Sequence, residues 1–311
     1  MEKRKILLIT GSGRSGSTLL SKLLNEIEGA FNVNELVFLH LNGVVRDYPC
    51  NTGEKFSESA VWKNIMAAYR SRNEIDLLEY KPHLIPNTRK LVKSQLLPYS
   101  KTNEATNPYF QAYQQAIKDL YEAIFEVTNA SIIIDSSKIA PFVNVVAHLK
   151  DFDLYVLHLV RDPRAVAHSW QKTIRREDVD ASTNLFMEKR TPARSSIRWQ
   201  LVNRFAETLK NHANLKYHYL KYEDFAAEPA KYLAEILHFL NLPANTIPVE
   251  NGNTIQLKRE DYGIWGNPNV RTQKNIVKVK MDDQYKAELP TRDRITATIY
   301  AMPLLWKYGY K

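Results

Sequence analysis

The stretch from residue 5 to residue 19, KILLITGSGRSGSTL, decides the fold of this chain. Its apolar run, Ile6–Ile9, predicts a short buried strand of a parallel sheet. Glycines follow at once, and apolar residues then recur at helical spacing, namely Leu19, Leu20, Leu23, Leu24 and Ile27. A strand, a glycine-rich loop and a helix in this order aim consecutive backbone N–H groups and a helix N-terminus at one point. The stretch therefore predicts an anion-binding site at the end of a parallel strand.

Within this loop, Gly11 and Gly16 have the spacing of a Walker A motif, G-x-x-x-x-G-K-[ST]. Ser17 stands where that motif has the lysine that reaches the β- and γ-phosphates of a nucleoside triphosphate, which argues against an ATPase. Arg14 offers a planar fork of donors to an oxyanion instead. A glycine-serine turn without a ligand is the alternative, and the flanking strand and helix favour the anion site.

Further strands and helices alternate along the chain. Ile132–Ile134, Leu154–Val160 and Tyr217–Leu220 are typical of strands. Apolar stripes indicate helices after these strands, with Ile197, Leu201, Phe205 and Leu209 in one and Leu233, Ile236, Leu237 and Leu240 in another. This alternation predicts an α/β fold, with a P-loop-like parallel sheet flanked by helices on both faces.

Residues 48–129 contain no clear strand. One helix is indicated there by apolar residues that share a face, Tyr113, Ile117, Leu120 and Ile124. We expect a mostly helical insertion at 48–129 within a single domain that spans residues 1–311.

Composition limits the class of protein. The 311 residues are 44% hydrophobic and 25% charged, which is typical of a soluble globular protein. No apolar run reaches about 18 residues, so we expect no transmembrane helix, and the apolar run before Gly11 is too short for a signal-peptide core. Cys50 is the only cysteine, so no intrachain disulfide is expected. A reducing compartment fits this composition, and we expect a cytoplasmic protein.

The formal net charge of +9 is compatible with nucleic-acid binding. However, lysine and arginine are spread along the chain, without a long basic run or a basic helix face. Several arginines lie inside motifs that suit one small polyanion. Composition alone leaves both interpretations open.

A second motif, VRDPRAVAHSW, occupies residues 160–170. Arg161 lies at the carboxyl end of a predicted strand, where open parallel sheets bind ligands. Ser169 follows eight residues later, in a helix predicted to begin after Pro163. An arginine and a hydroxyl that converge on one point suit a second phosphate group. An arginine paired with Asp162 at a helix start is the alternative.

Together the two motifs resemble those of the sulfotransferases that use 3′-phosphoadenosine 5′-phosphosulfate (PAPS). The likeness is greatest to the branch with carbohydrate and protein-tyrosine sulfotransferases and many bacterial small-molecule enzymes. The 5′-phosphosulfate loop of that family resembles Gly13, Arg14, Ser15, Gly16, Ser17 and Thr18. The family's 3′-phosphate motif resembles Arg161 through Ser169. Animal cytosolic members carry lysine where this chain has Arg14, which favours the carbohydrate and protein-tyrosine branch.

The resemblance implies roles for further residues. Glu35 falls 21 residues after Arg14, which is similar to the position of the catalytic glutamate in tyrosylprotein sulfotransferases. Lys138 resembles a lysine near the bridging oxygen of the donor, and Tyr222 resembles a tyrosine that lies against the nucleotide. A surface lysine and a solvated helix-start glutamate are the alternatives for Lys138 and Glu35.

A late stretch resembles the loop that closes over the 3′-phosphate in many bacterial members. It includes Asn267 and Arg271, which the resemblance implies as nucleotide contacts. Trp199 and Asn203 share one helix face and either border the adenine or, for the tryptophan, pack in the core.

Histidine is the base in cytosolic relatives. His40 is the only histidine near a motif on the acceptor side, whereas His158 and His168 flank the 3′-phosphate motif and are expected to be structural. No histidine and carboxylate pair has metal-ligand spacing, so we expect no metal.

The resemblance implies direct in-line transfer of a sulfuryl group from PAPS, with 3′-phosphoadenosine 5′-phosphate (PAP) as product. A hydroxyl or amine of a small-molecule or carbohydrate acceptor would receive it, and the insertion at 48–129 would select that acceptor. Glu35, or alternatively His40, would take the proton, while Arg14 and Lys138 stabilise the developing charge. A P-loop nucleotide kinase or NTPase and a non-catalytic nucleic-acid-binding protein are the alternatives. We expect neither nucleic acid nor membrane as a partner, and the oligomeric state does not follow from the sequence.

Overall fold

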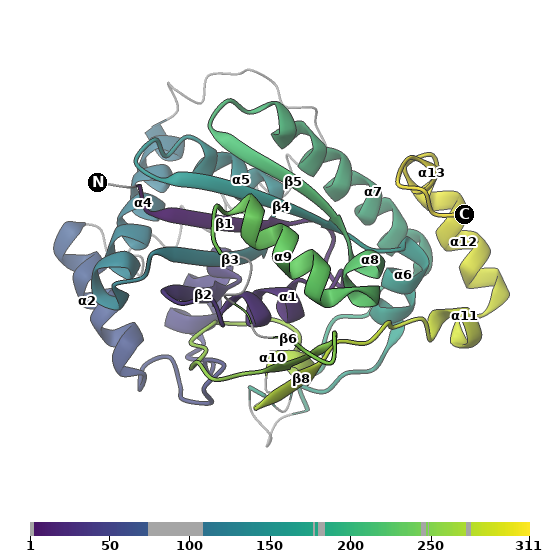
Figure 1. Ribbon diagram of the computed structural model, residues 1–311, viewed down its shortest axis with the longest axis horizontal. Helices are drawn as coiled ribbons and strands as arrows, with labels where there is room; N and C mark the ends of the chain where they lie inside the picture. Colours follow the sequence, from purple (N-terminus) through teal and green to yellow (C-terminus); the bar gives the residue numbers. More distant parts are fainter. Residues whose placement is uncertain are drawn as a thin grey trace.

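Five parallel strands form the centre of the protein, in the order β2-β3-β1-β4-β5 (Figure 1). A computed structural model describes residues 3–73, 108–176, 178–179, 184–243, 247, 249–271 and 275–311. The strands are β1 (Lys5–Thr10), β2 (Ala30–Asn34), β3 (Ile132–Lys138), β4 (Asp153–Val160) and β5 (Leu215–Lys221). The predicted α/β fold, a parallel sheet flanked by helices, is confirmed.

The edge strand β2 is the strand of the central sheet that the sequence did not indicate. Its sequence, AFNVN, carries asparagines where a buried strand usually has apolar residues. Both asparagines are buried, and Asn32 Nδ2 donates to Asn34 Oδ1 and to Asp261 Oδ1. A polar partner from far along the chain therefore compensates for the missing hydrophobic pattern.

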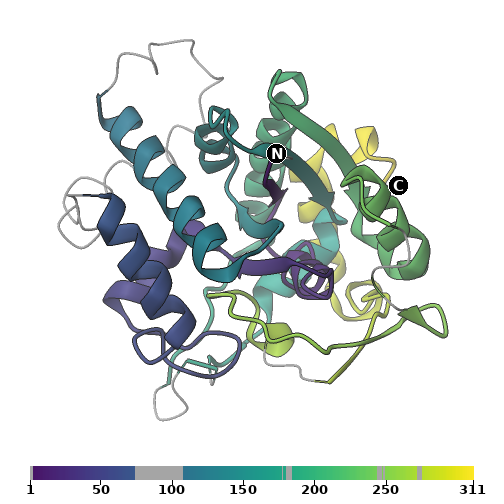
Figure 2. The same cartoon turned by 60° about the vertical axis from the view of Figure 1, so that its left-hand side comes forward.

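Helices cover both faces of the sheet (Figures 1 and 2). One face packs on α1 (Ser17–Leu24), α8 (Tyr222–Ala227) and α9 (Pro229–Phe239). The other packs on α2 (Ala60–Arg72), α4 (Pro108–Thr128) and α5 (Ala140–Ala147). Successive residues of β1 alternate between these two cores, because side chains of a strand point to opposite faces. A strand buried on both faces explains the continuous apolar run in the sequence.

A third apolar cluster joins the helices beyond β4. It brings together α6 (Pro163–Gln171), α7 (Pro192–Thr208), α12 (Thr291–Ala301) and α13 (Leu304–Lys307). The apolar stripe predicted for α7 is only partly confirmed, since Ile197 is 44% exposed whereas Phe205 packs against a core cluster and Leu209, just after α7, is buried. The buried face of α7 consists instead of Ser195, Ser196, Trp199, Val202, Asn203 and Ala206. Small side chains let α7 approach α6 and α12 closely, and hydrophobicity alone does not reveal such a face.

The described part of the insertion at 48–129 is mostly helical. Figure 2 shows α2 and α4 packed side by side. The predicted face of α4 is confirmed, because Tyr113, Ile117, Leu120 and Ile124 are all buried. Residues 74–107 of the insertion lie outside the described residues. No helix among the described residues is long and apolar enough to cross a membrane.

Short segments after β2, α7 and α9 complete the fold. β2 is followed by η1 (Leu36–Phe38) and η2 (Leu39–Val45), and α7 is followed by η4 (Leu209–Asn211). A small antiparallel sheet comprises β6 (Val249–Glu250), β7 (Thr254–Gln256) and β8 (Ile276–Lys278). Between β7 and β8 the chain forms α10 (Pro268–Arg271), and after β8 it forms α11 (Tyr285–Glu288). The central strand β1 lies between β3 and β4, so its carboxyl end is the switch point where such sheets bind ligands.

Candidate active site

A pocket of about 660 Å³ opens at the carboxyl ends of the parallel strands. It collects most of the residues that the sequence singled out, although they come from distant parts of the chain. Those that line it are Gly13, Arg14, Gly16, Ser17, Thr18, Glu35, Lys138, Arg161, Ser169, Tyr222 and Asn267.

The loop between β1 and α1 is pressed against its surroundings. Gly11 and Gly16 have φ angles of 128° and 94°, which side chains rarely adopt. A Cβ at Gly11 would lie 2.3 Å from the carbonyl oxygen of Leu159, and a Cβ at Gly16 would lie 2.5 Å from the Tyr222 ring. Glycine is therefore required at both positions, and the loop is held at the sheet edge by β4 and by Tyr222.

Arg14 turns an incompletely bonded guanidinium into the pocket. Its Nη2 donates to Met187 Sδ at 3.2 Å, a weak acceptor, and the guanidinium lies 4.8 Å from the centre of the Trp170 ring. Its Nε and Nη1 are buried and have no hydrogen-bond partner among the described residues. Burial is the main cause that lowers the pKa of Arg14 to about 10, so the side chain stays charged near neutral pH. A buried guanidinium with two open donors suits an oxyanion.

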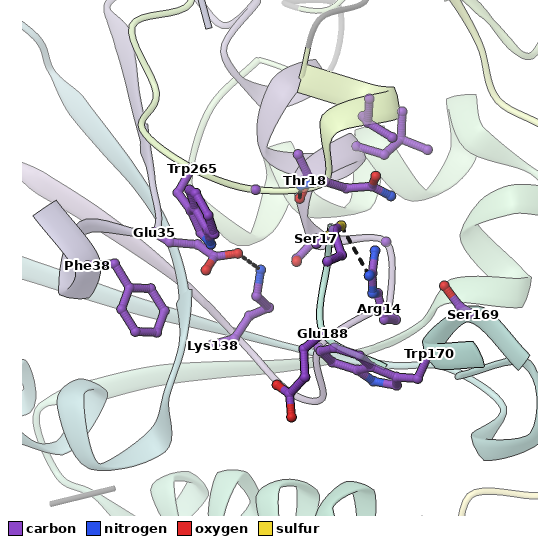
Figure 3. A pocket seen from close by; sticks show the side chains of 18 of the residues that line it. Arg14, Ser17, Thr18, Glu35, Phe38, Lys138, Ser169, Trp170, Glu188 and Trp265 are labelled. Carbon is purple, nitrogen blue, oxygen red and sulfur yellow. Dashed lines mark hydrogen bonds and ion pairs between the residues drawn. The ribbon is translucent and has the colours of Figure 1, made fainter. Parts of the chain in front are cut away.

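Glu35 and Lys138 face each other across the pocket floor. Lys138 Nζ lies 2.5 Å from Glu35 Oε1, and both side chains are nearly buried. The two residues meet because β2 and β3 are parallel neighbours that end together, with Asn34 paired to Asp135. Figure 3 shows this ion pair between Phe38 and Ser17, with Trp265 beside Glu35. A carboxylate and an ammonium group at this point can take a proton and stabilise an anion, respectively.

A buried network supports this ion pair from behind. Ser137 Oγ donates to Asp135 Oδ1 and accepts from the main-chain N–H of Val37, at 3.1 Å. Tyr121 donates to the other oxygen of Asp135 at 2.7 Å. Burial raises the pKa of Asp135 to about 6, against the effect of these hydrogen bonds. Ser137 therefore ties the turn after Glu35 to the strand that carries Lys138.

Arg161 differs from Arg14 because it has a carboxylate partner. Its Nη2 donates to Asp282 Oδ2 at 2.8 Å and to the carbonyl oxygen of Asp282 at 3.1 Å. Its Nη1 donates to the carbonyl oxygen of Arg14 at 3.2 Å, and the guanidinium lies over the Tyr222 ring. Its Nε is buried without a partner among the described residues. Asp162, the partner considered from the sequence, binds Arg164 instead.

Three predicted residues do not line the pocket. Ser15 is fully buried inside the loop, and His40 lies in η2, outside the pocket wall. Arg271 is a correction, because only 1% of it is exposed and its guanidinium points into the interior. There Asn51 and Asp178 accept its hydrogen bonds at 2.8 and 3.2 Å. A buried carboxylate thus draws this arginine away from the pocket, while Asn267 of the same stretch remains in its wall.

The helix face with Trp199 also lies outside the pocket. Trp199 is fully buried, and its Nε1 donates to the carbonyl oxygen of Arg161 at 2.9 Å. Asn203 Oδ1 lies 2.9 Å from His158 Nε2, and Tyr217 lies at the other ring nitrogen. Burial lowers the pKa of His158 to about 4, so this histidine is neutral and structural. These residues support β4 and Arg161 from beneath and do not border the pocket.

The sequence did not indicate a second set of pocket residues. Arg176 lies 3.7 Å from the centre of the Trp265 ring, which also stacks on Tyr48. Others in this set are Phe38, Arg46, Trp170, Phe186, Met187, Glu188, Arg190 and Arg198. Trp265 lies two residues before Asn267 in the sequence, and this proximity was the one signal that could have indicated Trp265 as a pocket residue. The arginines carry no local motif, because their approach to the pocket is set by tertiary packing.

No group of three histidine, cysteine, aspartate or glutamate side chains among the described residues could hold a metal ion. Arginine side chains and Lys138 supply positive charge to the pocket wall.

A family model described as "Sulfotransferase family" matches residues 7–246. The chain is similar to the sulfotransferase domain from the Synechococcus PCC 7002 olefin synthase, with a TM-score of 0.46 and 19% identity. That match covers 100% of this chain and 96% of the other. It is also similar to the sulfotransferase domain from the curacin biosynthetic pathway, with a TM-score of 0.48, 16% identity and coverage of 100% and 99%. No curated protein sequence matches the chain.

Proposed function

Since the chain belongs to the sulfotransferase family, we propose that it transfers a sulfuryl group from PAPS to a small-molecule or carbohydrate acceptor. The acceptor atom is a hydroxyl oxygen or an amine nitrogen. The observation that carries the proposal is the pocket itself. It holds two arginines with buried open donors, Arg14 and Arg161, beside the Glu35–Lys138 ion pair.

Donor binding follows from the positions of these cations. The N–H groups of the loop 11–18 and Arg14 bind the 5′-phosphosulfate, because both present donors to one oxyanion. Arg161 and Ser169, which both line the pocket, bind the 3′-phosphate. Figure 3 shows Ser169 on the far side of Arg14 from the Glu35–Lys138 ion pair. Tyr222 and Asn267, which flank the loop, contact the nucleotide. The open donors of the two arginines support this fit, since a buried unpaired donor is costly without a ligand.

The reaction is an in-line displacement at sulfur. The acceptor atom attacks the sulfuryl sulfur, Glu35 takes the acceptor's proton, and the bond from sulfur to the 5′-phosphate oxygen breaks to release PAP. Lys138 and Arg14 stabilise the charge on the sulfuryl oxygens and on the leaving phosphate. As in phosphoryl transfer, positioning and electrostatics supply nearly all of the catalysis. The sulfuryl group carries less charge than a phosphoryl group, so cationic side chains replace Mg²⁺.

Calorimetry tests the donor assignment first. PAP is titrated into the protein with and without EDTA, and ATP is titrated with and without Mg²⁺. We expect PAP to bind tightly in EDTA and better than ATP, because Arg14 and Arg161 supply the counter-charge. A strict Mg²⁺ requirement with ATP as the better ligand would instead indicate a nucleotide kinase or NTPase. Affinity for DNA or RNA that falls steeply with salt, without PAP binding, would indicate a nucleic-acid-binding protein.

Turnover tests the reaction. The protein is incubated with labelled PAPS and a panel of phenols, alcohols, amines and sugars, and each mixture is analysed by mass spectrometry. We expect the mass of SO₃ to be added to an acceptor only when PAPS and protein are both present. A panel with no sulfated product, beside normal PAP binding, would contradict the proposed transfer to these acceptor classes.

A further inference from the structure

A group of charged side chains beside Trp170 plays no part in the reaction described above. Glu188, Arg190 and Arg198 all line the pocket, and Arg194 lies next to them at the start of α7. Glu188 is paired with Arg190 at 2.8 Å and with Arg194 at 3.6 Å. Two arginines therefore share one carboxylate, which is itself about half exposed.

The position of Arg190 is fixed. Its guanidinium lies 3.8 Å from the centre of the Trp170 ring, and its main-chain N–H donates to the carbonyl oxygen of Trp170. The side chain is only 12% exposed, and its Nε is buried without a partner among the described residues. Arg190 therefore resembles Arg14. Both guanidinium groups lie against the Trp170 ring, and both have a buried Nε without a hydrogen-bond partner among the described residues.

Arg198 lies one helical turn beyond Arg194 and has no carboxylate partner among the described residues. Its pKa is lowered, first by burial and then by the positive charge of Arg190, while Glu188 opposes this shift and Arg194 adds to it. Neighbouring guanidinium groups that repel one another at a pocket wall are stabilised by a bound anion.

The donor leaves this charge unused. In the proposed function, the 5′-phosphosulfate takes Arg14 and the loop, and the 3′-phosphate takes Arg161 and Ser169. Figure 3 shows the Glu188 carboxylate directed away from Arg14 and from the loop. The neighbouring wall is apolar, with Leu185, Phe186 and Val202. Phe186 is 48% exposed and belongs to none of the three core clusters of the described residues, so its ring is available to a ligand.

We propose that Arg190 and Arg198 bind an oxyanion of the acceptor, so that the natural acceptor is an anion with an apolar body. This inference rests on the proposed function, because it assigns these arginines to the acceptor only after the donor has taken the others. Glu188 competes with the acceptor's oxyanion for Arg190 and therefore weakens binding of that anion. The two arginines act on binding and orientation of the acceptor and not on the reacting atoms.

Matched pairs of acceptors that differ only in charge test the inference. The pairs are 4-hydroxyphenylacetate with 4-hydroxyphenylacetamide, and 3-hydroxydecanoate with its amide. Each compound is titrated calorimetrically into protein saturated with PAP, so that the donor's anion sites are occupied. We expect the anion of at least one pair to bind about tenfold or more tightly than its amide, as charged hydrogen bonds to arginine imply.

Three variants and one control identify the residues responsible. Arg190→Gln and Arg198→Gln should each reduce the preference for the anion, and the amide should bind as it does to the wild type. Glu188→Gln should raise the preference, because the competing carboxylate is removed. Arg204→Gln is the matched control, since Arg204 lies on α7, is exposed and does not line the pocket. It should leave the preference unchanged.

The outcomes separate this inference from the proposed function. Titration of PAP alone tests the proposed donor site. If PAP does not bind, the same pairs of acceptors are titrated into the unliganded protein. Equal affinities within both pairs overturn the inference. So does a preference for the anion that survives both Arg190→Gln and Arg198→Gln, or one that Arg204→Gln removes equally. Because Arg198 is exposed, its variant should fold even if Arg190→Gln does not.

Discussion

The loop around Arg14 and the motif around Arg161 each present an arginine to the same pocket, but they do so in opposite states. Arg14 has two buried donors without partners among the described residues and a single weak bond to Met187. Arg161 has its Nη2 occupied by Asp282, which contributes both a carboxylate and a carbonyl oxygen. An anion can therefore join Arg14 without displacing a charged group. At Arg161 it must displace Asp282 or bind beside it.

The difference follows from where each arginine sits. Arg14 has a φ angle of 69° within a loop whose glycines are pressed on β4 and Tyr222, so its backbone is fixed locally. Arg161 follows β4 directly, and its partner arrives from the segment after β8, more than 100 residues later. The loop is thus prepared for the anion on its own, whereas the motif depends on a distant segment.

The largest effect is expected for Glu35, because neither arginine can take over the role of proton acceptor. Glu35→Gln keeps the size of the side chain but removes the proton acceptor, so turnover should fall by about 10²–10⁴-fold while PAP affinity stays nearly unchanged. Turnover with an aliphatic alcohol and calorimetry with PAP measure the two quantities. A phenol is unsuitable, because it is acidic enough to react with little help from a base.

His40→Asn is the control for the base, since His40 lies outside the pocket wall. It should reduce turnover far less than Glu35→Gln. An inactive His40→Asn beside an active Glu35→Gln would move the base to the histidine, and full activity of both would remove a side-chain base from the mechanism.

The contrast between the two arginines predicts different losses of affinity. Arg161→Ala should weaken PAP by roughly 10–100-fold but leave adenosine 5′-phosphate unchanged, because only PAP has the 3′-phosphate. Arg14→Ala should weaken both nucleotides alike. Calorimetry with the two nucleotides measures this, and Ser169→Ala should show a smaller version of the Arg161 effect. If Arg161→Ala keeps the wild-type preference for PAP, Arg161 does not contact that phosphate.

His158, which lies in the strand that leads to Arg161, predicts that stability depends on pH. The pKa of His158 is about 4 in the folded protein, below its usual 6.5, so between these values only the unfolded chain binds the proton. Stability should therefore be full above about pH 6.5 and decrease as the pH falls toward 4. From pH 7.5 to 5.5 the loss from this group is roughly 1 kcal/mol. Urea denaturation at both pH values should show a smaller decrease for His158→Gln, and an unchanged decrease would contradict this account.

The smallest effect concerns Asp282. If the 3′-phosphate replaces its carboxylate at Arg161, Asp282→Asn should tighten PAP by about two- to fivefold, as expected for loss of a competing, partly exposed ion pair. Adenosine 5′-phosphate should bind as before. Asp283→Asn is the matched control, because Asp283 pairs only weakly with exposed Lys286. Weaker PAP binding in Asp282→Asn would show that Asp282 supports the donor and does not compete with it.

Local signals explain how much of the fold could be predicted. The strand, glycine loop and helix at residues 5–24 are contiguous, and the φ angles of that loop already require glycine at Gly11 and Gly16. Four of the five strands of the central sheet were visible as apolar runs. The strand β2 was not, since its buried Asn32 and Asn34 donate to Asp261 and to the carbonyl oxygen of Trp265, which no local pattern connects to it. The stripe of α7 misled for a related reason, because its buried face, apart from Trp199 and Val202, is made of small or polar side chains.

The sequence by itself determined the family, the parallel sheet and the two motifs that carry Arg14 and Arg161, since each depends on residues that are neighbours along the chain. Only the tertiary structure decided how the charges are shared. It paired Glu35 with Lys138 across parallel strands, gave Asp282 to Arg161 and directed Arg271 inward to Asp178. It also placed Arg190 and Arg198 in the pocket wall, a position that no sequence motif predicted. The partner of a charged side chain is chosen by packing between distant segments, and burial makes that choice energetically decisive.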